Sequence, residues 1–164
     1  MKKIRINGVK AMIKVMFVCH GNICRSPMAE FIFKDLVKKE GLEDLFEIAS
    51  SAVSFEEIGN PVYPPAREIL AENGISCAGK RAVHFEYSDY KNYDYIPVMD
   101  QSNMRNILRI TRGENDGRIK LLLEYAGETA SVSDPWYSGD FKTAYDDILR
   151  GCTALLDSIK PNKP

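Results

Sequence analysis

The sequence predicts a single α/β domain, a three-layer α/β/α sandwich built on a four-stranded parallel sheet. Short apolar runs rich in β-branched residues alternate with longer stretches whose apolar residues recur every three to four positions. The 164 residues, 45% hydrophobic and 27% charged, are enough for one buried core but leave no room for a second domain. We therefore expect one domain over residues 12–160, preceded by an extension or tail at 1–11, with Met1 and Met12 both candidate starts.

The first strand, loop and helix follow one another near the N-terminus. Residues 13–18 are apolar and largely β-branched, which is typical of a strand buried on both faces. Ser26 suits a helix N-cap and Pro27 suits the first helical position, and apolar residues then recur on one face until Gly41. This order places residues 19–26 at the carboxyl end of a strand, where parallel sheets bind ligands.

Three further strands and three further helices are expected. The strands are predicted at residues 46–54, 93–99 and 119–123. One helix opens at Pro64-Pro65, and a second carries Met104, Ile107 and Leu108. The third runs from Phe141 to Ile159, with Asp140 as its cap. Pro97 does not fit the interior of a strand because it has no N–H to donate. We expect a bulge or a strand end there.

Composition narrows the classes of partner. The chain has 22 Lys and Arg against 23 Asp and Glu, so its charge gives no reason to expect nucleic acid or an anionic membrane surface. No apolar run approaches the roughly 20 residues of a membrane-spanning helix, and the N-terminus lacks the apolar core of a secretory signal. The expected location is the cytoplasm.

The four cysteines are Cys19, Cys24, Cys77 and Cys152. They are too few and too scattered for the disulfide framework of a small secreted domain, so we expect thiols. The separation of Cys19 and Cys24 is not the paired spacing of a zinc site. We predict no structural metal and no cofactor.

The loop of residues 19–26 (CHGNICRS) has the chemistry of an anion site with a nucleophile. A thiol attacks phosphorus as thiolate, which needs an electropositive environment. Inward-turned backbone amides, the N-terminus of the following helix and Arg25 would provide it, and the same groups would hold a phosphate. Gly21 and Asn22 tolerate the positive φ of such a loop, and Ser26 can donate a hydrogen bond to the Cys19 thiolate.

A structural explanation competes with this one. Cys19 could be a buried cysteine at a strand end with a helix cap after it, since a cysteine six residues before an arginine also occurs by chance. The strand before the loop, Gly21 and Asn22 inside it, and a helix opening directly after it favour the catalytic interpretation.

The run Val18 to Glu30 (VCHGNICRSPMAE) resembles the signature of the low-molecular-weight protein tyrosine phosphatases. The similarity extends from Ile13 to Ile159 and includes residues 51–54 (SAVS), 59–61 (GNP), 99–103 (MDQSN) and 134–137 (DPWY). It implies hydrolysis of phosphotyrosine through a phosphocysteine at Cys19. The phosphate would be held by Arg25 and by the loop residues His20, Gly21, Asn22, Ile23, Cys24 and Ser26.

The resemblance also assigns roles outside that phosphate-binding set. Asp134 would protonate the leaving phenolate and then activate the water that hydrolyses the phosphocysteine. Cys24 would pair reversibly with Cys19 under oxidation, although a packing role is equally consistent with the sequence. Cys77 and Cys152 are expected to be structural.

The expected pocket walls are partly unusual. Trp136 and Tyr137 would stack on a phenyl ring and deepen the cleft. On the opposite wall Glu56 stands where many relatives have an aromatic residue, which Phe55 would replace only by a shift. The segment 79–81 (GKR) lacks a histidine found in many relatives, and His20 and His84 are not expected to be catalytic.

Three other functions are possible on a scaffold of this kind, and the sequence argues against each. An arsenate reductase on this scaffold would need a further cysteine pair, which is missing. Protein-arginine phosphatases resemble this chain but carry a threonine where it has Ile23. A binding module without turnover would not need Cys19, Arg25 and Asp134 together. The expected partners are phosphotyrosine proteins or small aryl phosphates, with inorganic phosphate or other oxyanions in the loop.

Overall fold

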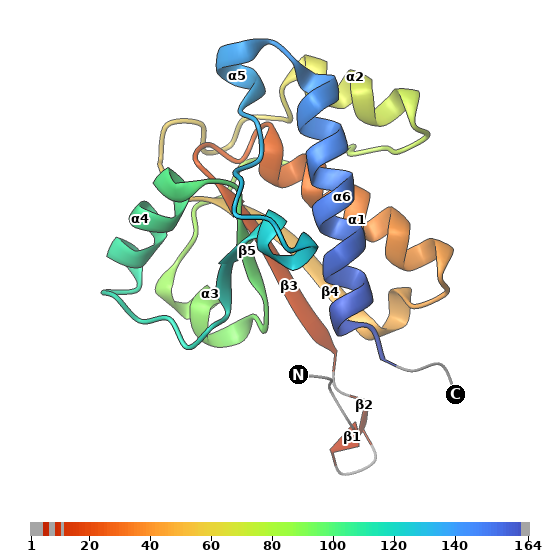
Figure 1. Cartoon of the computed structure of the whole chain (residues 1–164), viewed down its shortest axis with the longest axis vertical. Coiled ribbons are helices and arrows are strands. Elements are labelled where there is room, and N and C mark those ends of the chain that lie inside the picture. Colours follow the sequence, from red (N-terminus) through yellow and green to blue (C-terminus); the bar gives the residue numbers. More distant parts are fainter. Residues whose placement is uncertain (1–4, 7–8, 11, 162–164) are drawn as a thin grey trace.

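The computed structural model describes residues 5–6, 9–10 and 12–161, and it confirms the predicted α/β fold (Figure 1). Four parallel strands form the central sheet in the order β4-β3-β5-β6. The strands are β3 (Ile13–Cys19), β4 (Phe46–Ala52), β5 (Ile96–Val98) and β6 (Ile119–Leu121). Two short strands, β1 (Arg5–Ile6) and β2 (Val9–Lys10), pair antiparallel outside this sheet, within the expected extension at 1–11.

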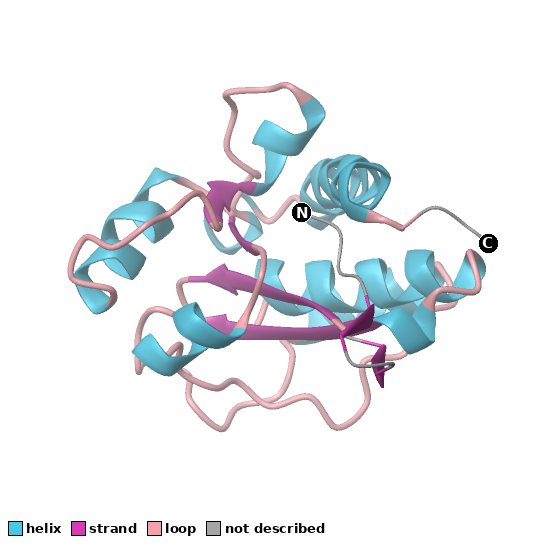
Figure 2. Cartoon of the chain, turned by 90° about the horizontal axis from the view of Figure 1, so that it is seen from below, coloured by secondary structure: helices cyan, strands magenta, loops and turns pink. Residues whose placement is uncertain are grey.

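The helices cover both faces of the sheet, as the sandwich requires (Figures 1 and 2). They are α1 (Arg25–Lys39), α2 (Pro64–Glu72), α3 (Tyr87–Asn92), α4 (Gln101–Ile110), α5 (Pro135–Ser138) and α6 (Phe141–Ile159), with 3-10 turns η1 (Glu43–Leu45) and η2 (Leu122–Ala126). None of the helices in the described part of the chain is long and apolar enough to cross a membrane.

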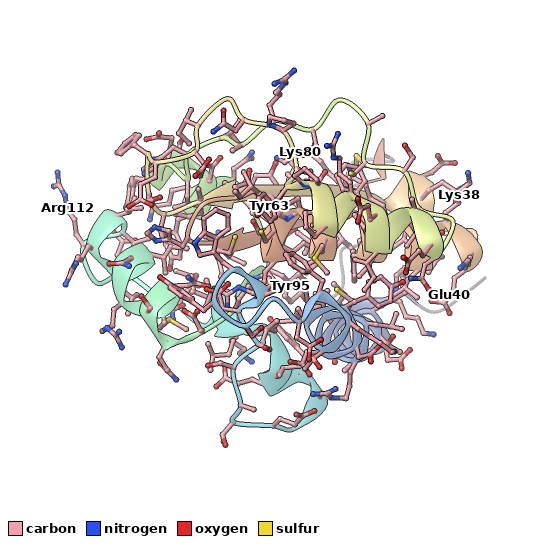
Figure 3. All side chains as sticks on the ribbon, turned by 90° about the horizontal axis from the view of Figure 1, so that it is seen from above. Lys38, Glu40, Tyr63, Lys80, Tyr95 and Arg112 are labelled. Atoms are coloured by element: carbon pink, nitrogen blue, oxygen red, sulfur yellow. The ribbon has the colours of Figure 1, made fainter. Side chains whose placement is uncertain are left out.

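The alternation of side chains along β3 builds both halves of the core. Val15 and Phe17 pack with α1 and α6 on one face, whereas Met16 and Val18 pack on the other face with the residues of α3 and α4. These four β3 side chains are at most 5% exposed, which confirms a strand buried on both faces. Charged side chains such as Arg112 and Lys38 project from the periphery (Figure 3).

The third predicted strand is much shorter than residues 93–99. Tyr95 exchanges hydrogen bonds with β3, and Ile96 donates to Arg118 beside β6. This alternation turns the nitrogen of Pro97 towards β3, where it has no hydrogen to donate. The contact with β3 therefore divides into a bridge at Tyr95 and the pair Val18–Val98, consistent with the expected interruption at proline.

Several other boundaries differ from the prediction. Ser26 is not the N-cap of α1: the helix starts at Arg25 after Cys24, and the Ser26 hydroxyl contacts Cys19 instead. The strand predicted to reach residue 54 ends at Ala52, and the one predicted to reach residue 123 ends at Leu121, where η2 begins. The short helices α3 and α5 were not predicted, because four to six residues carry too little periodicity.

Candidate active site

The loop of residues 20–24 joins the carboxyl end of β3 to α1 and forms the floor of a cavity of about 470 Å³. The cavity is lined by Cys19, His20, Gly21, Ile23, Cys24, Arg25, Glu56, Glu57, Asp100, Ser102, Asn103, Asp134, Trp136 and Tyr137. Most of the residues predicted for the site therefore meet in one cavity. The side chains of Asn22 and Ser26 are buried on the side of the loop away from the cavity, and Phe55 does not line the cavity.

Asn22 fixes the shape of the loop from below. Its backbone has a φ of 60°, the left-handed conformation that asparagine tolerates better than most residues. Its side chain, in a residue only 1% exposed, accepts from the Val83 N–H at 3.1 Å and donates to the hydroxyls of Ser26 at 2.7 Å and Ser50 at 2.9 Å. All of its strong polar groups are thus used to hold the loop.

The direction of these hydrogen bonds places donors at the Cys19 sulfur. Because the Val83 N–H only donates, the Asn22 oxygen faces it and the Asn22 NH₂ must donate to Ser26. The Ser26 oxygen already accepts from Asn22, so the Ser26 hydroxyl can donate to Cys19 Sγ, 3.0 Å away; the Ser51 carbonyl, at 3.4 Å, is a more distant acceptor for the same hydrogen. The Asn22 backbone N–H adds a second donor at 3.4 Å. Both contacts stabilise negative charge on sulfur.

A buried ion pair supports the network from behind. The Ser50 hydroxyl donates to Glu30 at 2.6 Å, and Lys80 lies 3.6 Å from the same carboxylate and donates to the Ser50 carbonyl at 3.0 Å. Burial lowers the pKa of Lys80, and the Glu30 charge opposes this shift. Lys80 thus supports the loop from the segment of residues 79–81.

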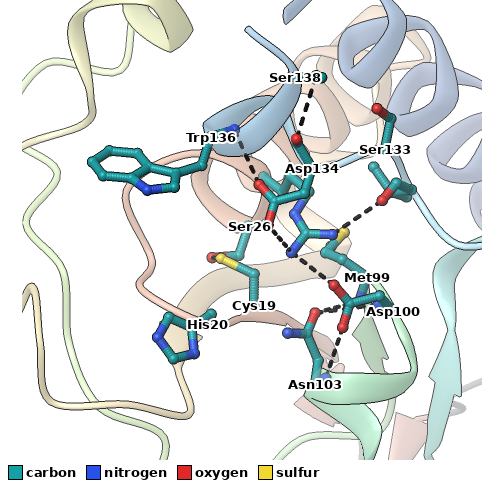
Figure 4. A network of polar contacts seen from close by, with 12 residues as sticks. Cys19, His20, Ser26, Met99, Asp100, Asn103, Ser133, Asp134, Trp136 and Ser138 are labelled. Atoms are coloured by element: carbon teal, nitrogen blue, oxygen red, sulfur yellow. Dashed lines mark hydrogen bonds and ion pairs between the residues drawn. The ribbon is translucent and has the colours of Figure 1, made fainter. Parts of the chain in front are cut away.

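Arg25 contacts two carboxylates at the edge of the cavity, those of Asp100 and Asp134, which Figure 4 labels. One guanidinium nitrogen is 2.9 Å from Asp100 and 3.3 Å from Asp134, and the other donates to the Val132 carbonyl at 3.0 Å. The arginine is only 3% exposed, so its direction is fixed by these partners. It is placed to bind an anion at the loop with a preformed orientation.

Asp134 is oriented by the backbone of the helix that it caps. It is the N-cap of α5: one carboxylate oxygen accepts from the Trp136 N–H at 3.1 Å, and the other faces Arg25. Its side chain is 30% exposed and borders the cavity, where a leaving group and water would have access. The proline at 135 starts the helix and keeps Asp134 extended.

Sequence reasoning assigned no site role to six residues that the structure brings to the site: Glu30, Ser50, Lys80, Asp100, Ser102 and Asn103. Asp100 had a detectable signal, because Asp100 and Asn103 form a capping box directly after a strand. Glu30, Ser50 and Lys80 had none, since the contacts that join these three to one another span 20 or more residues along the chain.

The residues of the aromatic wall and of the opposite wall have different contacts and exposure. Trp136 leans on Tyr63, with ring centroids 5.0 Å apart, whereas Tyr137 is 86% exposed. On the other side Phe55 does not act as a cavity wall: its ring stacks on His84 at 3.7 Å. Glu56 lines that wall instead, with one carboxylate oxygen 2.9 Å from Nε2 of His20.

Cys24 differs from Cys19 in its surroundings. Burial, the Cys19 thiolate and Asp134 together raise the pKa of Cys24 to about 12, and Arg25 only partly offsets them. A thiol is charged when deprotonated, so the Cys24 thiolate appears only as the pH rises towards that value. All four cysteines are free in the structure.

We expect iodoacetamide at about pH 8 to alkylate Cys19 and to leave Cys24 unmodified, because with a pKa of about 12 only about one Cys24 in 10⁴ is ionised. Peptide mapping by mass spectrometry after timed alkylation checks this, with the unfolded, reduced protein as the control in which every cysteine reacts. Alkylation of Cys24 in the folded protein at a rate like that of Cys19 would contradict it.

Comparison with known proteins identifies relatives along almost the whole chain. Residues 14–164 match the family described as "Low molecular weight phosphotyrosine protein phosphatase". The low molecular weight protein-tyrosine-phosphatase YfkJ of Bacillus subtilis is 42% identical over 93% of this chain and 99% of its own length. Its crystal structure superposes with a TM-score of 0.87, over 90% of this chain and 94% of that one.

Two further relatives span equally large parts of the chain. The low molecular weight phosphotyrosine protein phosphatase of Schizosaccharomyces pombe is 45% identical over 90% of this chain and 97% of its own. The structure of a Drosophila arginine phosphatase, 30% identical, has a TM-score of 0.82 over 92% of this chain and all of that one. The chain belongs to the low molecular weight phosphotyrosine protein phosphatase family and is a protein-tyrosine-phosphatase.

Proposed function

We propose that Cys19 is the nucleophile of this phosphatase, that Arg25 and the loop amides bind the phosphate, and that Asp134 is the general acid and base. The observation that carries the proposal is the convergence of the three side chains on one cavity, with two hydrogen-bond donors directed at the Cys19 sulfur. The remaining loop residues, His20, Gly21, Asn22, Ile23, Cys24 and Ser26, shape or support the phosphate site, and Glu56, Trp136 and Tyr137 form its walls.

In the first step the Cys19 thiolate attacks phosphorus. An S–P bond forms, the P–O bond to the phenol breaks, and the electron pair of that bond moves to the phenol oxygen, which takes a proton from Asp134. Arg25 stays beside the nonbridging oxygens, where charge is spread in the transition state.

In the second step water attacks the phosphocysteine. Asp134, now ionised, takes a proton from the water as its oxygen bonds to phosphorus, and the P–S bond breaks. The products are inorganic phosphate and the Cys19 thiolate, which leaves the site ready for another turnover. The hydrogen bond from Ser26 stabilises the sulfur as leaving group.

We further propose phosphotyrosine proteins or small aryl phosphates as substrates, a cytoplasmic location, and a phosphatase domain at residues 12–160. The likeness to an arginine phosphatase makes phosphoarginine the alternative. Ile23, which is 8% exposed and lines the cavity, favours a flat aromatic ring over the polar guanidinium group that carries the phosphate in phosphoarginine.

The test is phosphate release from peptides that carry phosphotyrosine, phosphoarginine or phosphoserine at the same position. We expect preference for phosphotyrosine that disappears in Cys19→Ser, with Cys77→Ser as the matched cysteine control away from the loop. Preference for phosphoarginine would overturn the assigned substrate, and equal activity in Cys19→Ser would remove Cys19 from the mechanism.

A further inference from the structure

The cavity that receives a phosphate dianion is lined by an excess of carboxylates. Its charged lining consists of one arginine, Arg25, and four acidic residues, Glu56, Glu57, Asp100 and Asp134. Phosphate binding must therefore depend on backbone amides and the single guanidinium at the floor. The acidic residues at the walls instead affect whatever surrounds the phosphorylated side chain.

The four carboxylates fall into two pairs with different partners. Asp100 and Asp134 both contact the Arg25 guanidinium, at 2.9 and 3.3 Å. Glu57 bonds only to the neutral amide of Asn60, at 2.7 Å, and Glu56 is shared with the His20 ring at 2.9 Å while 69% of its side chain is exposed. Within the described residues, the 56–57 wall therefore carries negative charge without a lysine or arginine partner.

The position of these two glutamates is constrained. The Asn60 hydrogen bond fixes the Glu57 head, and the Glu57 stem lies so close to Gly21 that a Cβ there would come within 3.3 Å of Glu57 Cγ. Phe55, directly before them, is anchored by its stack on His84, with ring planes 5° apart. Charges held in place before binding lose less entropy when a partner arrives.

We propose that Glu56 and Glu57 make this enzyme select phosphotyrosines flanked by basic residues and reject those in acidic sequence contexts. The inference rests on the proposed function of the same cavity and names its substrate class. A phosphotyrosine reaches the loop floor with its ring against Trp136, and the adjacent peptide residues then lie at the rim beside the two glutamates. A lysine or arginine there meets negative charge that has no lysine or arginine partner, whereas an aspartate or glutamate meets repulsion.

The phosphate dianion itself strengthens this discrimination. Bringing two negative charges into a cavity walled by Glu56 and Glu57 has an electrostatic cost, which falls when the same substrate carries a neighbouring cation. A small aryl phosphate without flanking residues bears this cost without the compensation. Peptides with basic flanks should therefore exceed both acidic peptides and small aryl phosphates in kcat/KM.

The experiment measures kcat/KM for three phosphotyrosine peptides that differ only in flanks (two lysines, two serines or two glutamates) and for p-nitrophenyl phosphate. We expect the lysine peptide to exceed the glutamate peptide by on the order of tenfold at low salt, with the ratio falling as ionic strength rises. In the double variant Glu56→Gln, Glu57→Gln the ratio should approach one. The matched control is Glu43→Gln, an exposed glutamate at the opposite, amino end of β4.

The ratio between peptides is measured within each variant, so partial loss of folded enzyme cancels. A ratio near one in the unaltered enzyme, or a ratio that persists in the double variant, would overturn the proposal while leaving the phosphatase assignment intact. Absence of Cys19-dependent turnover on all three peptides would instead show that the proposed function of the cavity is wrong.

Discussion

Replacing Cys19 with serine is expected to lower kcat on phosphotyrosine peptides by on the order of 10⁴-fold or more, because a hydroxyl at this position is protonated and is a far weaker nucleophile. The pocket itself should survive. Ser26 and the Asn22 N–H can hydrogen-bond a serine oxygen as they do the sulfur, and none of the groups proposed to bind phosphate is changed. The variant should therefore bind inorganic phosphate without turning over substrate.

The measurement uses a probe that the chain already contains. Trp136 is the only tryptophan in the sequence and lines the cavity, so its fluorescence reports binding there directly. Phosphate titrations of the unaltered enzyme, Cys19→Ser and Cys77→Ser should give similar dissociation constants, whereas only Cys19→Ser loses turnover. Residual activity within tenfold of the unaltered enzyme would exclude Cys19 as the nucleophile.

Asp134→Asn is expected to lower kcat/KM by about 10²–10⁴-fold for phenol-like leaving groups and much less for p-nitrophenyl phosphate, whose leaving group needs little protonation. Asparagine keeps an oxygen that can cap α5 at the Trp136 N–H, so the change removes the transferable proton and spares the local fold. A series of aryl phosphates measures the dependence on leaving-group pKa.

Asp100→Asn supplies the matched control for this series. Asp100 contacts the same guanidinium as Asp134, and at a shorter distance, 2.9 against 3.3 Å, so its loss should disturb the orientation of Arg25. A disturbed arginine weakens phosphate binding whatever the leaving group is. We expect a nearly uniform loss for Asp100→Asn and a steep dependence for Asp134→Asn; a uniform loss in both would mean that Asp134 acts only through Arg25.

The sequence was most informative where local patterns coincide with the fold. The β3 run, the loop after it and the long apolar periodicity of α6 each depend on neighbouring residues, and each was predicted in type and in approximate position. The loop residues were predicted because glycine and asparagine tolerate positive φ and the arginine that follows them can bind an anion. Where the pattern was short, as in α5, no helix was predicted.

The sequence-based predictions were incomplete or wrong where a side chain contacts a partner that is distant along the chain. Ser26 has the right chemistry for an N-cap, but its hydroxyl is used by Asn22 and Cys19 across the loop. Phe55 looks like a pocket aromatic and instead stacks on His84 from another loop. Glu30 appears in the sequence as one more charged helical residue with Lys34 one turn away, but it is 5% exposed, accepts a hydrogen bond from Ser50 and lies 3.6 Å from Lys80. Such choices depend on the tertiary fold.

The hydrogen bonds beneath the loop have a consequence for its motion. Asn22 is bound at once to Ser26 in α1, to Ser50 in β4 and to Val83 in the segment beside it. Opening the loop would break hydrogen bonds to three separate segments at once, which raises the free energy of local opening. The loop is ordered during folding, so that an arriving phosphate meets a site that needs no further ordering.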